Sequence, residues 1–156
     1  MTLVLALAAP AAAQSASPAK VTASIARLFG AGVRIDTVMV EQAPVLRMRR
    51  GEALLGFARI RTVKGKDQPI TLLIAVDTEA RLQDVDVLVY REPYGGEVAY
   101  ESWRKQFRGK NGGAPLVVGR DIRGISGATI SVNAVTLGVR GTLDDFARWH
   151  TAGVLE

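Results

Sequence analysis

The chain has 156 residues, 48% of them hydrophobic, with a formal net charge of +5 and a pI of about 10.0. These values are typical of one globular domain with its own core. The chain has no cysteine and a single histidine, His150, which excludes disulfides, thiolate metal centres, iron–sulfur clusters and cysteinyl cofactors and argues against a histidine metal site. The positive charges are scattered without interleaved aromatic residues, so we expect no nucleic-acid partner.

The first 13 residues are rich in leucine and alanine and end in three consecutive alanines. A short apolar run that ends in small residues is typical of a secretory signal peptide. The run is also too short to cross a bilayer as a helix. We therefore predict a signal peptide over residues 1–13, cleavage after Ala13 and a periplasmic location.

The segment that follows is predicted as a linker and a helix, distinct from the main domain. Residues 14–20 are polar and are expected to form the linker, and residues 21–29 place apolar side chains on one side of a short helix. Residues 14–32 are therefore assigned to this N-terminal part, and residues 33–156 to the main domain.

The first half of the main domain is predicted to be a β-sheet. Apolar runs and alternating apolar positions indicate strands at 33–40, 52–63, 70–76 and 82–90, with 42–51 as a loop or short strand. The short turns between these strands favour an antiparallel meander. The predicted fold class is α+β, with an antiparallel sheet meander packed with a few helices.

The second half is predicted to be mainly helical. After a loop at 91–97, residues 98–107 are expected to form a helix with Trp103 and Phe107 on one face. Such a pair belongs more often to a core than to the wall of a cofactor site. The last helix is predicted over 132–149, with a buried stripe of aliphatic side chains.

Residues 124–131, Gly-Ile-Ser-Gly-Ala-Thr-Ile-Ser, lead directly into this last helix. Their small side chains allow a ligand to approach the backbone closely, and Gly127 is free to adopt a positive φ. Unpaired N–H groups and the helix dipole favour an anion at such a position, above all a phosphate. The alternative is that Ser126 or Thr129 only caps the helix.

The stretch Ser126-Gly127-Ala128-Thr129, followed by Ile130-Ser131, resembles the attachment motif of the FMN-binding domain family. This family includes flavin-carrying subunits of the Rnf complex and of the sodium-pumping NADH:quinone reductase. The resemblance covers about two thirds of the chain. It implies FMN as the cofactor, held as a phosphoester on Thr129 by a dedicated flavin transferase, and a flavin at the N-terminus of the last helix.

Further site residues follow from the same resemblance. The family has a loop containing glutamate and glycine beside the flavin, and Glu92, Gly95 and Gly96 occupy that place with different spacing. An ordinary connection between a strand and a helix is the alternative for this loop. Tyr94 and Trp103 are candidate walls for the flavin ring.

One position departs from the family pattern. The family has an aspartate three residues before the motif serine, whereas this chain has Arg123. The departure bears on covalent attachment more than on FMN binding. Arg123 or Arg120 is expected to offset the charge of the phosphate.

The resemblance implies an exported FMN-binding electron-transfer protein whose partners are the flavin transferase and membrane-bound or periplasmic redox proteins. The alternatives are a protein that binds FMN without a covalent bond and a flavin-free periplasmic module that binds a ligand or partner. A serine hydrolase is disfavoured, because His150 would lie at the far end of the helix that starts beside Ser126.

Overall fold

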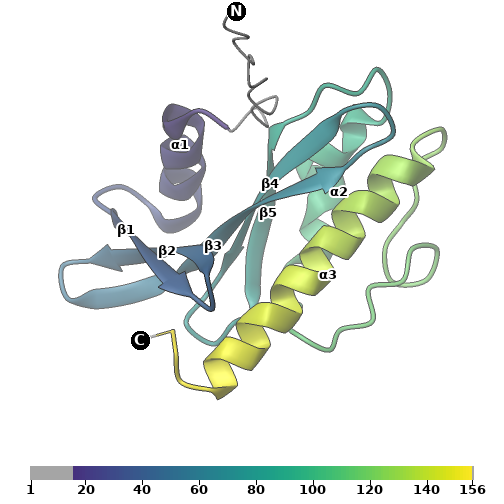
Figure 1. The fold of residues 1–156 in the computed structure, drawn as a ribbon. Helices are drawn as coiled ribbons and strands as arrows, with labels where there is room; N and C mark the ends of the chain where they lie inside the picture. Colours follow the sequence, from purple (N-terminus) through teal and green to yellow (C-terminus); the bar gives the residue numbers. More distant parts are fainter. Residues whose placement is uncertain (1–15, 156) are drawn as a thin grey trace, which may run out of the picture.

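The computed structural model describes residues 16–155, so the predicted signal peptide lies outside the described residues. The centre of the fold is an antiparallel sheet in which each strand pairs with the next along the chain (Figure 1). This confirms the predicted α+β meander, and the segment predicted as a loop or short strand is the second strand. The five strands are β1 (Arg34–Val40), β2 (Ala43–Arg50), β3 (Ala53–Lys64), β4 (Pro69–Val76) and β5 (Leu82–Val89).

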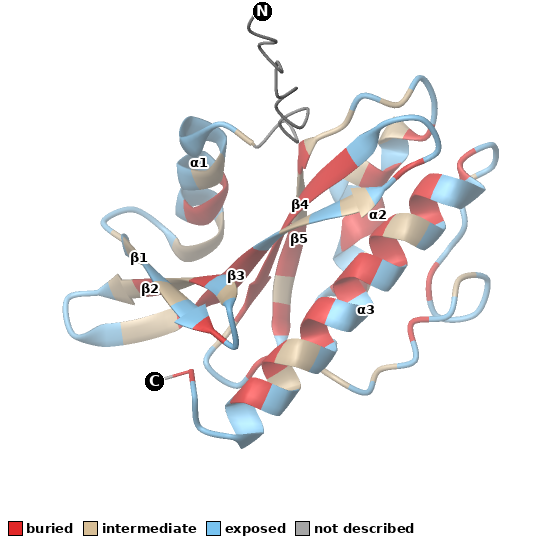
Figure 2. Cartoon of the chain, viewed as in Figure 1, coloured by how far each residue is buried: buried red, intermediate tan, exposed pale blue. Residues whose placement is uncertain are grey.

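Two helices cover opposite faces of the sheet. The short α1 (Pro18–Phe29) packs against one face, and the long α3 (Thr129–Thr151) crosses the other (Figures 1 and 2). On β4, Leu72 and Ile74 join the α3 core, while the alternating Leu73 joins the α1 core. Because side chains alternate along a strand, a strand covered on both faces must be apolar at nearly every position. This explains why β4 reads as a continuous apolar run.

The N-terminal helix begins earlier than predicted. Ser17 caps it by accepting a hydrogen bond from the Lys20 N–H, and Pro18 occupies its first turn. Serine caps a helix well, and proline is tolerated in the first turn, where backbone N–H groups have no intrahelical partner. The prediction of a linker up to residue 20 was therefore wrong for its last three residues.

The predicted helix over 98–107 is also wrong in detail. The chain instead forms a 3-10 turn at Gly96–Ala99, the short α2 at Glu101–Arg104 and a second 3-10 turn at Lys105–Phe107. Tyr100 is extended between the first two pieces. The Ala99 carbonyl accepts from the Arg104 guanidinium at 2.9 Å, and the Trp103 N–H bonds to the Tyr100 carbonyl instead of to Ala99. These residues pack along β5, one of the two edge strands of the sheet.

A buried carboxylate on β5 ties these parts together. Asp84 is fully buried and lies 3.0 Å from Arg104, 3.2 Å from Arg27 of α1 and 3.3 Å from Arg108. The nearby Asp86 is partly buried, and burial works against its charge. The Ser24 hydroxyl and Arg27 outweigh this effect and hold the pKa of Asp86 below its usual range.

No helix within residues 16–155 has the length and apolar character needed to cross a membrane.

We predict that Asp84→Asn lowers the free energy of unfolding by about 3–5 kcal/mol, since removing one partner of a buried ion pair leaves the others uncompensated. Denaturant unfolding of the flavin-free protein measures the change. The matched control is Asp36→Asn, which removes a more exposed carboxylate 3.4 Å from Arg34 and is expected to change stability by less than ~1 kcal/mol. Equal losses in the two variants would contradict the structural role of Asp84.

Candidate functional site

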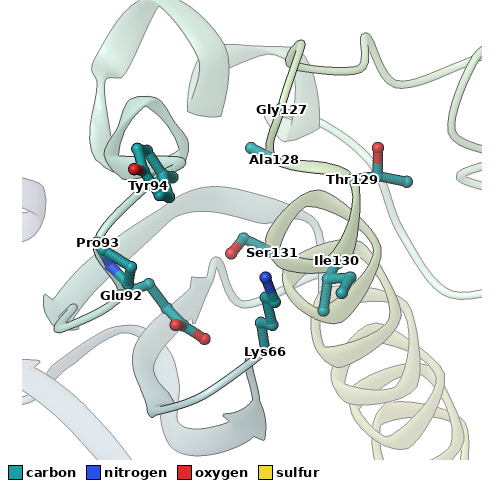
Figure 3. Close-up of a pocket in the computed structure, with 9 residues that line it drawn as sticks. All are labelled: Lys66, Glu92, Pro93, Tyr94, Gly127, Ala128, Thr129, Ile130 and Ser131. Atoms are coloured by element: carbon teal, nitrogen blue, oxygen red, sulfur yellow. The ribbon is translucent and has the colours of Figure 1, made fainter.

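A cavity of about 300 Å³ lies where three distant parts of the chain meet (Figure 3). These parts are the tip of the β3–β4 hairpin, the loop that follows β5 and the first turn of α3. The cavity is at the small end of the range for ligand sites, which starts at roughly 300 Å³. The residues that line it are Lys66, Glu92, Pro93, Tyr94, Gly127, Ala128, Thr129, Ile130 and Ser131.

The first turn of α3 is not capped by any side chain of the described residues. Its N-cap position is Ala128, a residue type that lacks a side-chain acceptor, and the helix begins at Thr129. Within residues 16–155, the N–H groups of Thr129, Ile130 and Ser131 have no hydrogen-bond acceptor. The alternative in which Ser126 or Thr129 serves as the cap does not hold in the structure, and the free N–H groups are left for an acceptor from outside.

The loop after β5 packs directly on this helix start. Gly95 has a φ of +82°, and a Cβ placed on it would lie 2.7 Å from the Ala128 Cβ and 2.8 Å from the Tyr90 hydroxyl. That hydroxyl donates to the Tyr94 carbonyl and lies 3.1 Å from the Ser131 hydroxyl. The loop is thus held against the motif, with the exposed Tyr94 ring at the rim of the cavity.

Glu92 joins this loop to the β3–β4 hairpin. Its Oε1 accepts from the backbone N–H of Asp67 at 2.9 Å and from that of Gln68 at 3.2 Å. Its Oε2 is buried, and within residues 16–155 it has no hydrogen-bond partner. A buried carboxylate oxygen without a donor is costly, and because Glu92 lines the cavity, a small rotation of its carboxylate would let this atom accept from an N–H or O–H of a ligand there.

Lys66, Pro93 and Ile130 line the cavity but are not among the predicted site residues, and of the three only Lys66 lies outside the predicted motif and loop. It lies on the tip of the β3–β4 hairpin, and its ammonium end points toward the cavity (Figure 3). The sequence predicts a hairpin tip here, but no local pattern indicates that the tip lies against a helix more than sixty residues further along the chain. Among the described residues, Lys66 is the positively charged residue that lines this cavity.

The two arginines expected to offset a phosphate do not line the cavity. Arg120 lies 3.1 Å from Asp121, and the hydrogen bonds of Arg120 and of the Val117 N–H hold the pKa of that carboxyl below its usual range. Arg123 donates instead to the Ser102 carbonyl at 3.0 Å.

Trp103 is also separate from the cavity that contains Thr129. Together with Arg123 it lines a second, more open hollow of about 370 Å³ on the chain just before the motif. Its ring is buried and packs edge-on against Phe107, with ring centroids 5.3 Å apart, which agrees with the core interpretation of this pair. Gly96 and Ser126 lie in the segments that border the first cavity but are not among its lining residues.

The hydrolase alternative fails on geometry. Ser126 precedes the start of α3, and His150 lies in its last turn, where it is 3.9 Å from Glu79. At 1.5 Å per residue, the helix places these two residues about 30 Å apart.

Comparison with known proteins identifies the family. The model of the FMN-binding domain matches residues 65–144, more than half of the chain, and the protein belongs to this family. The match confirms the resemblance found in the sequence and indicates FMN as the cofactor. The matched residues run from the β3–β4 hairpin tip into α3 and include every residue that lines the cavity.

Two individual proteins are similar over part of their length. The chain is 28% identical over 103 residues to a component of the proton-translocating ferredoxin:NAD(+) oxidoreductase complex of Clostridium ljungdahlii, covering 62% of this chain and 56% of that protein. The crystal structure of a component of the Na(+)-translocating NADH-quinone reductase from Parabacteroides distasonis aligns with a TM-score of 0.47 and 18% identity, covering 76% of this chain and 63% of that one. The chain therefore spans less than two thirds of either relative.

The residues of the cavity fit FMN. The free N–H groups of α3 and the Lys66 ammonium suit a phosphate, which is an anionic acceptor. The unpartnered Glu92 Oε2 suits a donor such as a ribityl hydroxyl or the flavin N–H. Pro93, Tyr94 and Ile130 offer apolar surface for the ring.

We predict that Gly95→Ala both destabilises the protein and weakens FMN binding at least several-fold. The added Cβ clashes with Ala128 and Tyr90 and requires a non-glycine residue at positive φ, which costs about 1 kcal/mol or more. Fluorescence titration of FMN measures the binding. The matched control is Gly96→Ala, because nothing lies within 4 Å of a Cβ at that position. Equal effects of the two substitutions would contradict the close contact of the loop with the motif.

Proposed function

We propose that the protein is an exported electron-transfer protein that carries FMN as a phosphoester on Thr129. The observation that carries the proposal is the uncapped first turn of α3, where an alanine N-cap leaves three N–H groups free beside the Thr129 hydroxyl. Thr129 is exposed and its hydroxyl makes no hydrogen bond within residues 16–155. This hydroxyl is accessible to a modifying enzyme, and a phosphate joined to it lies next to the free N–H groups.

FMN supplies the redox chemistry when it is bound. The residues of the chain hold and orient it. The N–H groups of α3 and Lys66 stabilise the charge that a phosphodiester retains. Glu92 would accept a hydrogen bond from the flavin or its ribityl chain, and Tyr94 and Ile130 would offer apolar surface to the ring.

The partners proposed are membrane-bound or periplasmic redox proteins. Support comes from the partial similarity to a component of a proton-translocating ferredoxin:NAD(+) oxidoreductase complex. A flavin transferase is proposed to install the cofactor, and export through a signal peptide over residues 1–13 is proposed from the apolar N-terminal sequence. A covalent bond suits a protein outside the cytoplasm, because a dissociated cofactor is lost there.

The test is co-expression with a flavin transferase, followed by denaturing electrophoresis and detection of flavin fluorescence in the protein band. We expect a fluorescent band for the natural chain and for Thr129→Ser, which keeps a hydroxyl, and no fluorescence for Thr129→Val. Circular dichroism of all three checks that they are folded.

Other results lead to the alternatives. Flavin released into the supernatant from the natural chain means non-covalent FMN binding and overturns the assignment of Thr129 as the attachment residue. Folded protein without any flavin leaves a flavin-free binding module. Covalent flavin in the Thr129→Val variant places the bond on another residue.

Lys66 allows a separate test of the anion site. We predict that Lys66→Met, which keeps the length of the stem and removes the charge, weakens non-covalent FMN binding by about two- to fivefold, as expected for an exposed charge pair. Binding of riboflavin, which lacks the phosphate, is expected to change less. The two affinities are compared at low and at high salt, since screening removes the difference. An equal effect on both ligands would show that Lys66 does not act on the phosphate.

A further inference from the structure

Arg123, just before the motif, makes three hydrogen bonds to one short segment, two through its backbone and one through its side chain. The Trp103 indole N–H donates to the Arg123 carbonyl at 2.8 Å. The Arg123 N–H donates to the Gln106 Oε1 at 2.8 Å, and the Arg123 guanidinium donates to the Ser102 carbonyl at 3.0 Å. Both polar groups of the Arg123 peptide therefore bond to side chains of residues 101–107, and we call these three bonds the Arg123 clamp.

The segment that makes the clamp is itself fixed to the sheet. Arg104 is buried, pairs with Asp84 of β5 at 3.0 Å and also donates to the Val85 carbonyl. Trp103 precedes Arg104 in α2, and Phe107 packs edge-on against the Trp103 ring. The position of the Trp103 indole is thus determined by a buried ion pair on one side and by core packing on the other.

Gln106 has one hydrogen-bonding role in the described structure. Its Oε1 accepts from Arg123, whereas its Nε2 is buried and has no partner within residues 16–155. Burying an amide donor without an acceptor is unfavourable. The side chain of Gln106 is therefore placed to accept from the Arg123 N–H, although this leaves its own N–H donor unpaired.

The loop that follows the clamp has few internal bonds of its own. Between Gly124 and the start of α3, the backbone bond given by the structure is from the Ala128 N–H to the Ile125 carbonyl, at 3.0 Å. Gly124 and Gly127 lower the conformational rigidity of this stretch, and Gly127 adopts a φ of +75°. Its shape, and with it the presentation of Thr129, therefore depends on the segment at its beginning and on α3 at its end.

We propose that Trp103 and Gln106 are positioning residues for the flavin attachment loop. They act through the peptide groups of Arg123 and orient residues 124–128, so that the free N–H groups of α3 and the Thr129 hydroxyl face the same ligand. Trp103 acts through its indole N–H and does not form a wall for the flavin ring, since the Trp103 ring is buried and lines the other hollow. The expected effect on FMN binding rests on the proposed function, whereas the hydrogen bonds that position the loop do not.

The experiment uses Trp103→Phe and Gln106→Leu in the full chain, purified without flavin. Each substitution removes one bond of the clamp; Gln106→Leu keeps a side chain of similar size, whereas Trp103→Phe also leaves a cavity in the core. The matched control is Trp149→Phe, because Trp149 is equally buried in the same core and its indole N–H also makes one bond, to Glu41 at 3.0 Å, at the other end of α3.

Amide hydrogen exchange by NMR is the first measurement. We expect the Arg123 and Ala128 amides to exchange about three- to tenfold faster in the two clamp variants, as loss of one hydrogen bond would produce. The amide of Val139, in the middle of α3, reports global unfolding and should change no more than in Trp149→Phe. Gln106→Leu is the sharper case, because it also removes the unpaired buried donor, and we expect it to change overall stability less than Trp103→Phe.

FMN titration is the second measurement. We expect several-fold weaker binding in both clamp variants, and binding within twofold of the natural chain for Trp149→Phe. Unchanged exchange at Arg123 and Ala128 in both clamp variants overturns the inference, whether or not the natural chain binds FMN. The inference is also overturned if Trp149→Phe increases the exchange rates of the Arg123 and Ala128 amides as much as the clamp variants do. If the clamp variants accelerate exchange and the natural chain binds no FMN, the proposed function fails and the positioning role of Trp103 and Gln106 stands.

Discussion

The burial of β4 on both faces is the constraint on which the rest of the structure depends. Its apolar side chains alternate between two cores, one under α3 and one under α1. A strand of this kind is stable only where both faces are covered. The long α3 must therefore lie across the sheet, and its N-terminus then comes to the edge where the β3–β4 hairpin and the loop after β5 end. The position of the cavity follows from this packing.

The start of α3 gives up local stability that a better N-cap would provide. A serine or aspartate at the N-cap position is worth about 1 kcal/mol over alanine. Ser126 is two residues too early in the chain to serve, and Thr129 already belongs to the helix. Locally unfavourable features of this kind are expected at functional sites, where a ligand completes the bonding. The unpartnered Glu92 Oε2 across the cavity is a second such feature.

Sequence periodicity was sufficient for four strands and for the body of α3, because their apolar patterns reflect burial directly, but it left β2 undecided and started α3 at residue 132 instead of Thr129. It failed at 98–107, where the extended Tyr100 separates the predicted helix into short pieces and the Arg104 guanidinium bonds the Ala99 carbonyl. The motif and the loop with Glu92 and Gly95 could be found from their resemblance to a family. Lys66 could not, since only the tertiary packing brings the hairpin tip to α3.

The size and openness of the cavity bear on why a covalent bond suits this protein. Ligand sites that hold a cofactor by contacts alone bury most of its surface in roughly 300–1,000 Å³, and the cavity here is about 300 Å³ with its aromatic residue, Tyr94, at the rim. Much of a flavin would remain accessible, which lowers the affinity but leaves the ring open to a redox partner. The proposed phosphoester on Thr129 would make the cofactor part of the chain and raise its effective concentration at the site, so that weak contacts would be enough to orient it. With such a bond, the protein would need to orient the flavin more than to bind it tightly, and the hydrogen bonds that hold Arg123 and the loop after it would matter more than the area of the cavity.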